Sequence, residues 1–254
     1  MKKISMASIP MPKKLREQIE NYNYQLTQDG FKYIISENHE VYIKGFKKGN
    51  PVEIPAYIEN LPVVYLAGLH NLPLFGAVKI PDTVRELEWA VFNVQESAES
   101  FLLPESLLRI DEHAFAWCKA LKELSFPDSV KELGLGTVMS CKKLKSLKLP
   151  AELEVIPECF ASGCSALEEI QIPDSVKVIK FMAFNDCGSL KTVHLPKGLK
   201  RIEKYAFCDC TSLKKIILPD SLEFIDKFAF AGCPELEKPE IPEGCEVHPK
   251  AFRP

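Results

Sequence analysis

Cysteine is the residue type whose number and spacing most invite a chemical interpretation in this chain. The sequence contains nine cysteines, and six of them recur at intervals of 23 residues. The six are Cys118, Cys141, Cys164, Cys187, Cys210 and Cys233. A structural metal site usually takes its ligands from closely spaced pairs such as Cys-x-x-Cys. Cys208 with Cys210 is the only close pair, so the spacing indicates one cysteine in each layer of a repeating structure.

The geometry of such a ladder does not favour disulfides. Neighbouring layers joined by parallel strands lie about 5 Å apart, a separation that a disulfide could bridge. However, side chains in one column point in the same direction, whereas a disulfide needs its two cysteines to converge. We therefore interpret the cysteines as buried, reduced thiols that pack and donate weak hydrogen bonds to turn carbonyls. Redox chemistry and metal binding remain the alternative interpretations.

The other residues that could do chemistry form no catalytic pattern. The five histidines are scattered at His39, His70, His113, His194 and His248. Gly134-x-Gly136 is a departure from the repeat and not a phosphate-binding fingerprint. No spacing argument assembles a Ser/His/Asp triad. We therefore predict no catalytic residue, no metal site and no cofactor, and we expect that the protein is not an enzyme.

A repeat of 23 residues organises the chain, with prolines at positions 81, 104, 127, 150, 173, 196, 219 and 242. Apolar residues occupy the third and the first position before the proline, as Ile170 and Ile172 do before Pro173. This alternation predicts a short strand with one buried face. The proline then ends the strand because it has no backbone N–H. A fixed period of this length predicts a solenoid in which each strand is covered by the next.

The second half of each unit adds further apolar columns. Aliphatic residues follow the proline by three and six positions, as Val176 and Ile179 do. A small residue beside an aromatic one comes next, in Ala114-Phe115, Ala183-Phe184, Ala206-Phe207 and Ala229-Phe230. One unit carries Cys159-Phe160 one place early, which we interpret as an adjustment after Pro157. We predict that these rings fill the interior of the solenoid.

The combined pattern Leu-x-x-Ile-x-Leu-Pro-x-Ser-Leu-x-x-Ile-x-x-x-Ala-Phe-x-x-Cys resembles the BspA-like type of leucine-rich repeat. The resemblance extends from roughly Val52 to Phe252. It implies a leucine-rich-repeat solenoid of the α/β class, rich in β-structure. It also implies a curved right-handed superhelix with a parallel sheet on its concave side. BspA-like proteins include surface adhesins of host-associated microbes, so the resemblance points to a bacterial protein. It implies little about activity, because the family is defined by its scaffold.

We divide the chain into an N-terminal cap, residues 1–50, and a repeat region, residues 51–254. The repeat region contains about eight units, and we expect the last one to act as a cap because its pattern decays.

The cap is expected to contain a helix and a hairpin. Leu15, Ile19, Tyr22 and Leu26 recur at helical spacing, which predicts a helix over residues 12–28. Residues 31–35 and 41–46 alternate as two strands, which predicts a hairpin around residues 37–39. Together they would cover the first core layer of the solenoid.

Composition and charge exclude several classes of partner. The net charge is −3 and the charges are well mixed, so the chain lacks the basic field that nucleic-acid binding needs. No apolar run reaches the length of a membrane span, so we predict no membrane insertion. Residues 1–12 do not fit a secretion signal, because their apolar stretch is short and is cut by Pro10 and Pro12. We therefore predict a cytoplasmic protein, with secretion or cell-surface display as the alternative.

Charged columns flank the predicted strands. Acidic residues follow the proline in six units, at Asp82, Glu105, Asp128, Asp174, Asp220 and Glu243. Lysines stand on the neighbouring side of the strand, at Lys122, Lys145, Lys191 and Lys214. We interpret both columns as a solvated rim that keeps the strands soluble. A charged groove for a protein partner is the alternative.

Two sets of outward-pointing side chains are the candidate binding surfaces. Position nine after the proline should point outward, because positions ten and eleven pack inward. It carries Met182, Tyr205 and Phe228 in three consecutive units, with Phe181 and Phe224 close by. Large apolar residues stacked in this way predict a contact patch, unless the outer layer covers them. The other set consists of outward strand positions on the concave face, at Lys148, Gln171, His194 and Ile217.

These features together predict a non-catalytic module for protein–protein interaction, because stacked repeats present a long curved surface. The partner is expected to be a protein of unknown identity, and weak self-association is one form that the contact could take. Two alternatives are a microbial surface adhesin that binds a host protein or glycan, and an intracellular structural scaffold. A sugar site would favour exposed aromatic rings, and the concave row contains none.

Overall fold

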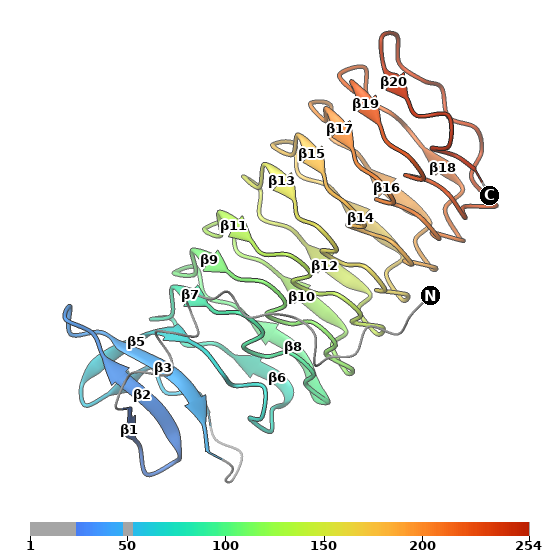
Figure 1. Cartoon of the computed structure of the whole chain (residues 1–254). Helices are drawn as coiled ribbons and strands as arrows, with labels where there is room; N and C mark the ends of the chain where they lie inside the picture. Colours follow the sequence, from blue (N-terminus) through green and yellow to red (C-terminus); the bar gives the residue numbers. More distant parts are fainter. Residues whose placement is uncertain (1–23, 48–52, 254) are drawn as a thin grey trace.

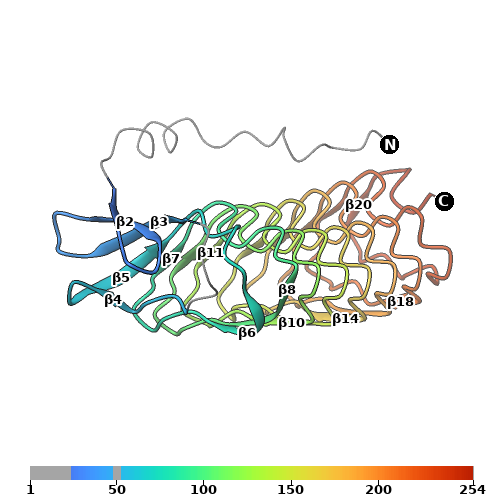
Figure 2. The same cartoon turned by 90° about the horizontal axis from the view of Figure 1, so that it is seen from below.

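The structure is an elongated coil in which successive turns of chain stack along one axis (Figure 1). It is a computed structural model and describes residues 24–47 and 53–253. Each repeat contributes short strands to two rows, which lie on different sides of the stack (Figure 2). The predicted solenoid of parallel strands is therefore confirmed.

The first row consists of the strands that precede the repeat prolines. They are β6 (Phe75–Lys79), β8 (Ser97–Leu102), β10 (Glu123–Ser125), β12 (Ser146–Lys148), β14 (Glu169–Gln171), β16 (Thr192–His194) and β18 (Lys215–Ile216). The register of the later strands pairs residues 23 positions apart, such as Leu124 with Leu147 and Ile170 with Val193. These central residues are buried and their neighbours are exposed, so the alternation read from the sequence reflects one inward face.

The second row follows the prolines and is built from two-residue strands. They are β7 (Glu86–Leu87), β9 (Arg109–Ile110), β11 (Glu132–Leu133), β13 (Val155–Ile156), β15 (Val178–Ile179), β17 (Arg201–Ile202), β19 (Phe224–Ile225) and β20 (Glu246–Val247). Ile156, Ile179 and Ile202 pair in register and are fully buried. Strands this short have no stability of their own, so the aliphatic column between layers must hold them.

Stacked phenylalanines fill the space between the rows. The rings of Phe184 and Phe207 lie 5.3 Å apart with planes only 6° from parallel, and Phe207 and Phe230 repeat this at 5.4 Å and 5°. Phe160, which comes one place early in its unit, still points inward and lies 6.2 Å from both Phe126 and Phe184. The predicted interior is therefore confirmed.

A third side of each turn is built from residues in the left-handed conformation. Position nine after the proline has a φ between 52° and 62° in seven consecutive units, at Ala90, His113, Gly136, Cys159, Met182, Tyr205 and Phe228. Position thirteen is also left-handed in the same units. These residues turn the chain sharply while alternate N–H groups bond to the next layer, as Phe184 N does to Ala206 O at 2.8 Å. We call this third side the turn side.

Both strand rows are interrupted at the same level of the stack. Among the described strands, β11 does not pair with β13, and β12 does not pair with β14. In other units the residue seven after the proline donates its N–H to the preceding layer, as Lys180 does to Ile156 O at 3.1 Å. Pro157 occupies this position and has no N–H to donate. A recess of about 600 Å³ opens between β11 and β13, and its apolar lining comes from Leu133, Leu153, Val155 and Pro157.

The turn side continues across this interruption. Val138 N donates to Phe160 O at 3.0 Å, and Ser140 N donates to Ser162 O at 2.7 Å. The two parts of the solenoid are therefore joined by main-chain bonds of the turn side and by the core.

The N-terminal cap differs from the prediction. Most of the predicted helix over residues 12–28 lies outside the described residues, and its described end is not helical. Gln25–Leu26 forms strand β1, which pairs antiparallel with β2 (Phe31–Ile35). Leu26 is 50% exposed and lies outside the core formed by the described residues, whereas the edge of β2 offers main-chain bonds. The turn between them is closed by Gly30 N donating to Thr27 O at 3.1 Å.

The predicted hairpin is confirmed and joins the cap to the repeats. β2 pairs antiparallel with β3 (Val41–Phe46), and the turn between them places His39 at a φ of 58°. β3 then pairs in parallel with β5 (Leu61–Leu66), which continues into the second row through β7. A short strand β4 (Tyr57–Ile58) folds back antiparallel onto β5. The first core layer is thus covered by strands.

Candidate functional site

The ladder cysteines use their thiols to join layers of the turn side. Cys118 Sγ donates to Phe92 O at 3.2 Å, and the other five donate to the residue 26 positions earlier at 3.1–3.3 Å. Gln95 replaces cysteine in the first of these units, and its Nε2 donates to Leu69 O at 3.3 Å. Because the Gln95 amide makes the same hydrogen bond as the thiols, we infer that this column serves hydrogen bonding and packing.

Burial keeps most of these thiols protonated. Burial raises the pKa of Cys164 to about 12 and raises the pKa of Cys187 well above its usual value. Cys233 differs, because its interaction with the Cys210 side chain lowers its pKa. The thiolate is the nucleophile and the metal ligand, so a protonated and buried thiol suits packing better than chemistry. In the described ranges, no three His, Cys, Asp or Glu side chains converge so as to hold a metal ion.

We expect at least seven of the nine cysteines to titrate as free thiols when the protein is unfolded in denaturant without a reductant. All nine are free in the structure, and parallel side chains in a ladder have poor geometry for a disulfide. A thiol-reactive chromophore counts them directly. Two or more disulfides would contradict this expectation and would favour an oxidising compartment.

Five of the ten residues of the charged rim have a partner within the described part of the chain. Lys122 Nζ lies 2.8 Å from Glu99 Oε2, and Lys191 Nζ lies 2.7 Å from Glu168 Oε2, each pair joining neighbouring layers. Asp128 Oδ1 accepts a hydrogen bond from Ala151 N at 3.0 Å. These exposed pairs contribute little free energy each and neutralise part of the rim. The geometry favours a solvated rim over a charged groove.

The predicted concave-face residues form an exposed row on the first strand row. Lys148, Gln171, His194 and Ile217 are all exposed, and Ile217 has 73% of its surface accessible. Gln171 and His194 are paired neighbours in β14 and β16. The missing ladder between β12 and β14 separates Lys148 from the other three. Their types are mixed, and they form no chemically distinctive patch.

Three of the predicted turn-side residues make a continuous stack of rings. The ring centres of Phe181 and Tyr205 lie 6.1 Å apart in an edge-to-face arrangement, and those of Tyr205 and Phe228 lie 5.2 Å apart and nearly parallel. We call Phe181, Met182, Tyr205 and Phe228 the aromatic stripe. All four are half-buried, so one side of each packs on the solenoid and the other reaches solvent.

Lysines lie over the rings of the stripe. Lys204 Nζ is 5.0 Å from the ring centre of Tyr205, and Lys227 Nζ is 4.8 Å from that of Phe228. The remaining predicted residue, Phe224, lies in β19 under Arg201 at 4.8 Å. In the part of the chain that the structure describes, no ring contact joins Phe224 to the stripe. Cations over rings make this surface both apolar and positive.

The left-handed backbone conformation of three stripe residues could not be predicted from the apolar pattern. Met182, Tyr205 and Phe228 have φ values of 54°, 60° and 62°. This conformation crowds Cβ against the following carbonyl oxygen and is uncommon for large residues. The sequence does contain a signal, because Gly136 occupies the same column and is left-handed too. Early units carry the small residue Ala90 there, and it is buried.

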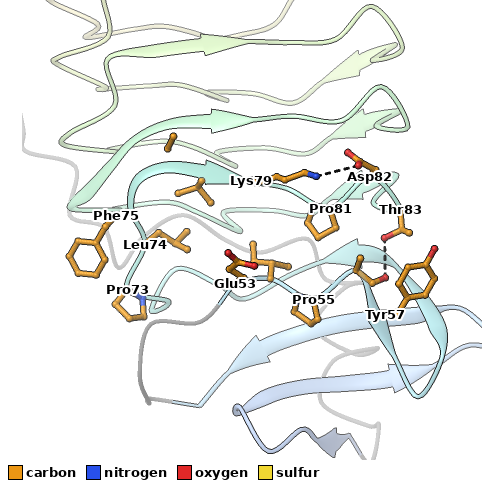
Figure 3. Close-up of a pocket in the computed structure, with 14 residues that line it drawn as sticks. Glu53, Pro55, Tyr57, Pro73, Leu74, Phe75, Lys79, Pro81, Asp82 and Thr83 are labelled. Carbon is orange, nitrogen blue, oxygen red and sulfur yellow. Dashed lines mark hydrogen bonds and ion pairs between the residues drawn. The ribbon is translucent and has the colours of Figure 1, made fainter.

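A cleft near the N-terminal end of the first row was missed by the sequence reasoning (Figure 3). It has a volume of about 700 Å³ and lies between residues 53–57 and 73–83. Tyr57 and Phe75 stand at its ends with 61% and 63% of their surfaces exposed. Lys79 Nζ and Asp82 Oδ2, 3.4 Å apart, line it between them. The unit before Pro81 has 26 residues instead of 23, and β6 pairs with β8 through a register shift at Gly76 and Ala77. Tyr57 and Phe75 therefore fall outside the repeat columns.

Comparison with known proteins agrees with the repeat geometry. The sequence profile of the BspA type leucine rich repeat region matches residues 69–188 and 155–253, in six copies. The chain belongs to the BspA-type leucine-rich repeat family. No curated protein sequence matches it significantly. In the described part of the chain, no helix has the length and apolar character needed to cross a membrane.

Three solved bacterial structures share the fold. A leucine-rich repeat protein from Bacteroides ovatus is 26% identical with a TM-score of 0.68, over 88% of this chain and 67% of its own. One from Eubacterium ventriosum is 26% identical with a TM-score of 0.61, over 80% of this chain. The T. pallidum leucine-rich repeat protein is 28% identical with a TM-score of 0.61, over 84% of this chain and 91% of its own. The match spans only 50% of the Eubacterium ventriosum chain.

Proposed function

We propose that this BspA-type protein is a non-catalytic interaction module that contacts a protein partner through its aromatic stripe. The observation that carries the proposal is the stack of half-buried rings, Phe181, Tyr205 and Phe228, on the outside of consecutive layers. Aromatic residues and methionine are enriched where proteins meet. The family is defined by a repeat scaffold, which supports a binding role rather than a catalytic one.

Backbone strain supports the same assignment. A left-handed residue with a large side chain costs about 1 kcal/mol or more relative to glycine. Gly136 and Ala90 in the same column demonstrate that the solenoid can form with small residues there. Large residues retained at a strained position, where folding does not need them, point to a role in contact.

We expect the variant Tyr205→Gly with Phe228→Gly to lose partner binding while it keeps its fold. Glycine suits the left-handed backbone, so the change removes the rings without distorting the turn. Immobilised wild-type and variant proteins would be compared for proteins that they retain from the native organism, with each candidate confirmed in purified form.

A matched control is Leu102→Gly, which removes an exposed apolar side chain from the first row. It should bind as the wild type does. If the stripe variant retained every partner of the wild type and its oligomeric state, the stripe would have no contact role.

A further inference from the structure

One outer surface of the solenoid, which we call the strip, changes the sign of its net charge along the molecule. It is formed by the second strand row and by the left-handed residue at position nine after the proline. The strip comprises positions four to nine after each of the seven prolines from Pro81 to Pro219. Its N-terminal half contains three cations and six accessible carboxylates, in residues 85–90, 108–113, 131–136 and 154–159; the buried Glu88 is left out. Its C-terminal half contains six cations and three carboxylates, in residues 177–182, 200–205 and 223–228. The two halves therefore carry opposite net charges on one surface of a protein whose net charge is −3.

The excess charges in each half have few partners in their own molecule. In the N-terminal half the three cations are already paired, for example Arg109 with Glu86, Asp111 and Glu132 at 3.4–3.9 Å. In the C-terminal half Lys200 is paired with Glu223 at 2.7 Å. No ion pair within residues 24–47 and 53–253 involves the other five, Lys177, Lys180, Arg201, Lys204 and Lys227. The free charges are thus negative in one half and positive in the other.

Among the described residues, three carboxylates of the N-terminal half, Glu112, Glu154 and Glu158, take part in no ion pair. Burial, followed by the charges of Asp111 and Glu158, raises the pKa of Glu112. Mutual repulsion of this kind is relieved when cations approach from another molecule.

The two halves also differ in shape. The left-handed position carries Ala90, His113, Gly136 and Cys159 in the N-terminal half, and the first three are buried. It carries the large half-buried residues Met182, Tyr205 and Phe228 in the C-terminal half. The recess between β11 and β13 lies in the N-terminal half as well. One half is therefore recessed and acidic, and the other protrudes and is basic.

We propose that two copies of this chain associate side by side and antiparallel, with the acidic half of each strip against the basic half of its partner. The proposal rests on the proposed function, in which the aromatic stripe is a contact surface, and it identifies the partner as a second copy. A two-fold axis makes both contacts equivalent, which is the usual arrangement of a homodimer. Complementary charge is what selects the antiparallel orientation over the parallel one.

The repeat places particular residues opposite each other. A two-fold axis between the units of Pro150 and Pro173 sets Glu154 and Glu158 of one copy against Lys177 and Lys180 of the other. One layer away from this axis, the rings of Phe181 and Tyr205 in one copy face the space between β11 and β13 of the second copy. The recess there, lined by Leu133, Val155 and Pro157, would receive the two rings.

Charge reversal in two variants tests the proposal. The variant Lys177→Glu with Lys180→Glu makes both halves of the strip acidic, and Glu154→Lys with Glu158→Lys makes both halves basic. Sedimentation velocity in low salt should detect wild-type dimers, which each variant alone weakens by roughly tenfold or more. An equimolar mixture of the two variants should restore the dimer, because every reversed charge then meets its opposite. The control variant Lys142→Glu with Lys143→Glu, exposed and outside the strip, should dimerise like the wild type.

The outcomes separate this proposal from the proposed function. A wild-type protein that stays monomeric at the highest soluble concentration, or a variant mixture that does not re-form the dimer, overturns self-association. In that case, loss of another partner by Tyr205→Gly with Phe228→Gly would still support the stripe as a contact surface. A dimer that responds to charge reversal and also to loss of the two rings supports both.

Discussion

Replacing Phe184 or Phe207 with alanine is expected to lower the free energy of unfolding by about 3–5 kcal/mol. Both rings are fully buried and stack on each other at 5.3 Å, so each deletion leaves a cavity between layers that neighbours cannot close. In a solenoid each layer is stabilised mainly by its two neighbours, so the loss is transmitted to both. Urea unfolding followed by circular dichroism measures the change.

The rim supplies the control for this prediction. Asp174 is exposed, and its change to asparagine should alter the free energy of unfolding by less than about 0.5 kcal/mol. If Asp174→Asn destabilised the protein more than Phe184→Ala, the assignment of inside and outside faces would be wrong.

The second large effect is expected at Gly134, whose substitution by alanine should cost about 2–4 kcal/mol. A Cβ at this position would lie 2.2 Å from Glu112 N and 2.5 Å from Asp111 C. Both atoms belong to the main chain of the preceding layer, so neither can move without breaking the stack. Gly134 N also donates to Ile110 O at 2.8 Å, which keeps the two layers in close contact.

Gly188→Ala is the matched control, because its Cβ would meet nothing closer than Thr211 Oγ1 at 3.5 Å. It should change the midpoint of urea unfolding only slightly. Equal effects of the two substitutions would indicate that the close approach at Gly134 does not exist in solution.

The periodic part of the fold could be predicted from the sequence because each column has one physical environment. Ile170, Phe184 and Cys187 recur at constant spacing because every layer presents the same neighbour above and below. Burial, register and the direction of the thiol hydrogen bonds all follow from that repetition. The prediction that position nine points outward is wrong for Ala90, His113 and Gly136, which are buried, whereas Tyr205 and Phe228 are half-buried.

Departures from the repeat were harder to predict. Leu26 fits a helical spacing, but pairing with the edge of β2 determines its conformation, and this competition is not visible in a local pattern. The cleft beside Tyr57 arises from three additional residues in one unit, so no column predicts it. The interruption beside Pro157 had a readable signal, because proline at that position removes a donor that the other units use.

The left-handed backbone of the stripe was also unexpected, and it makes the interaction hypothesis directly testable. The decisive measurement is the free energy of unfolding of Tyr205→Gly with Phe228→Gly. If the rings serve contact with a partner, release of the left-handed strain offsets the lost stacking, and the variant should stay within about 2 kcal/mol of the wild type. If the rings belong to the core, the loss should approach that of two buried phenylalanines, about 6 kcal/mol or more, and the interaction surface would have to be sought elsewhere.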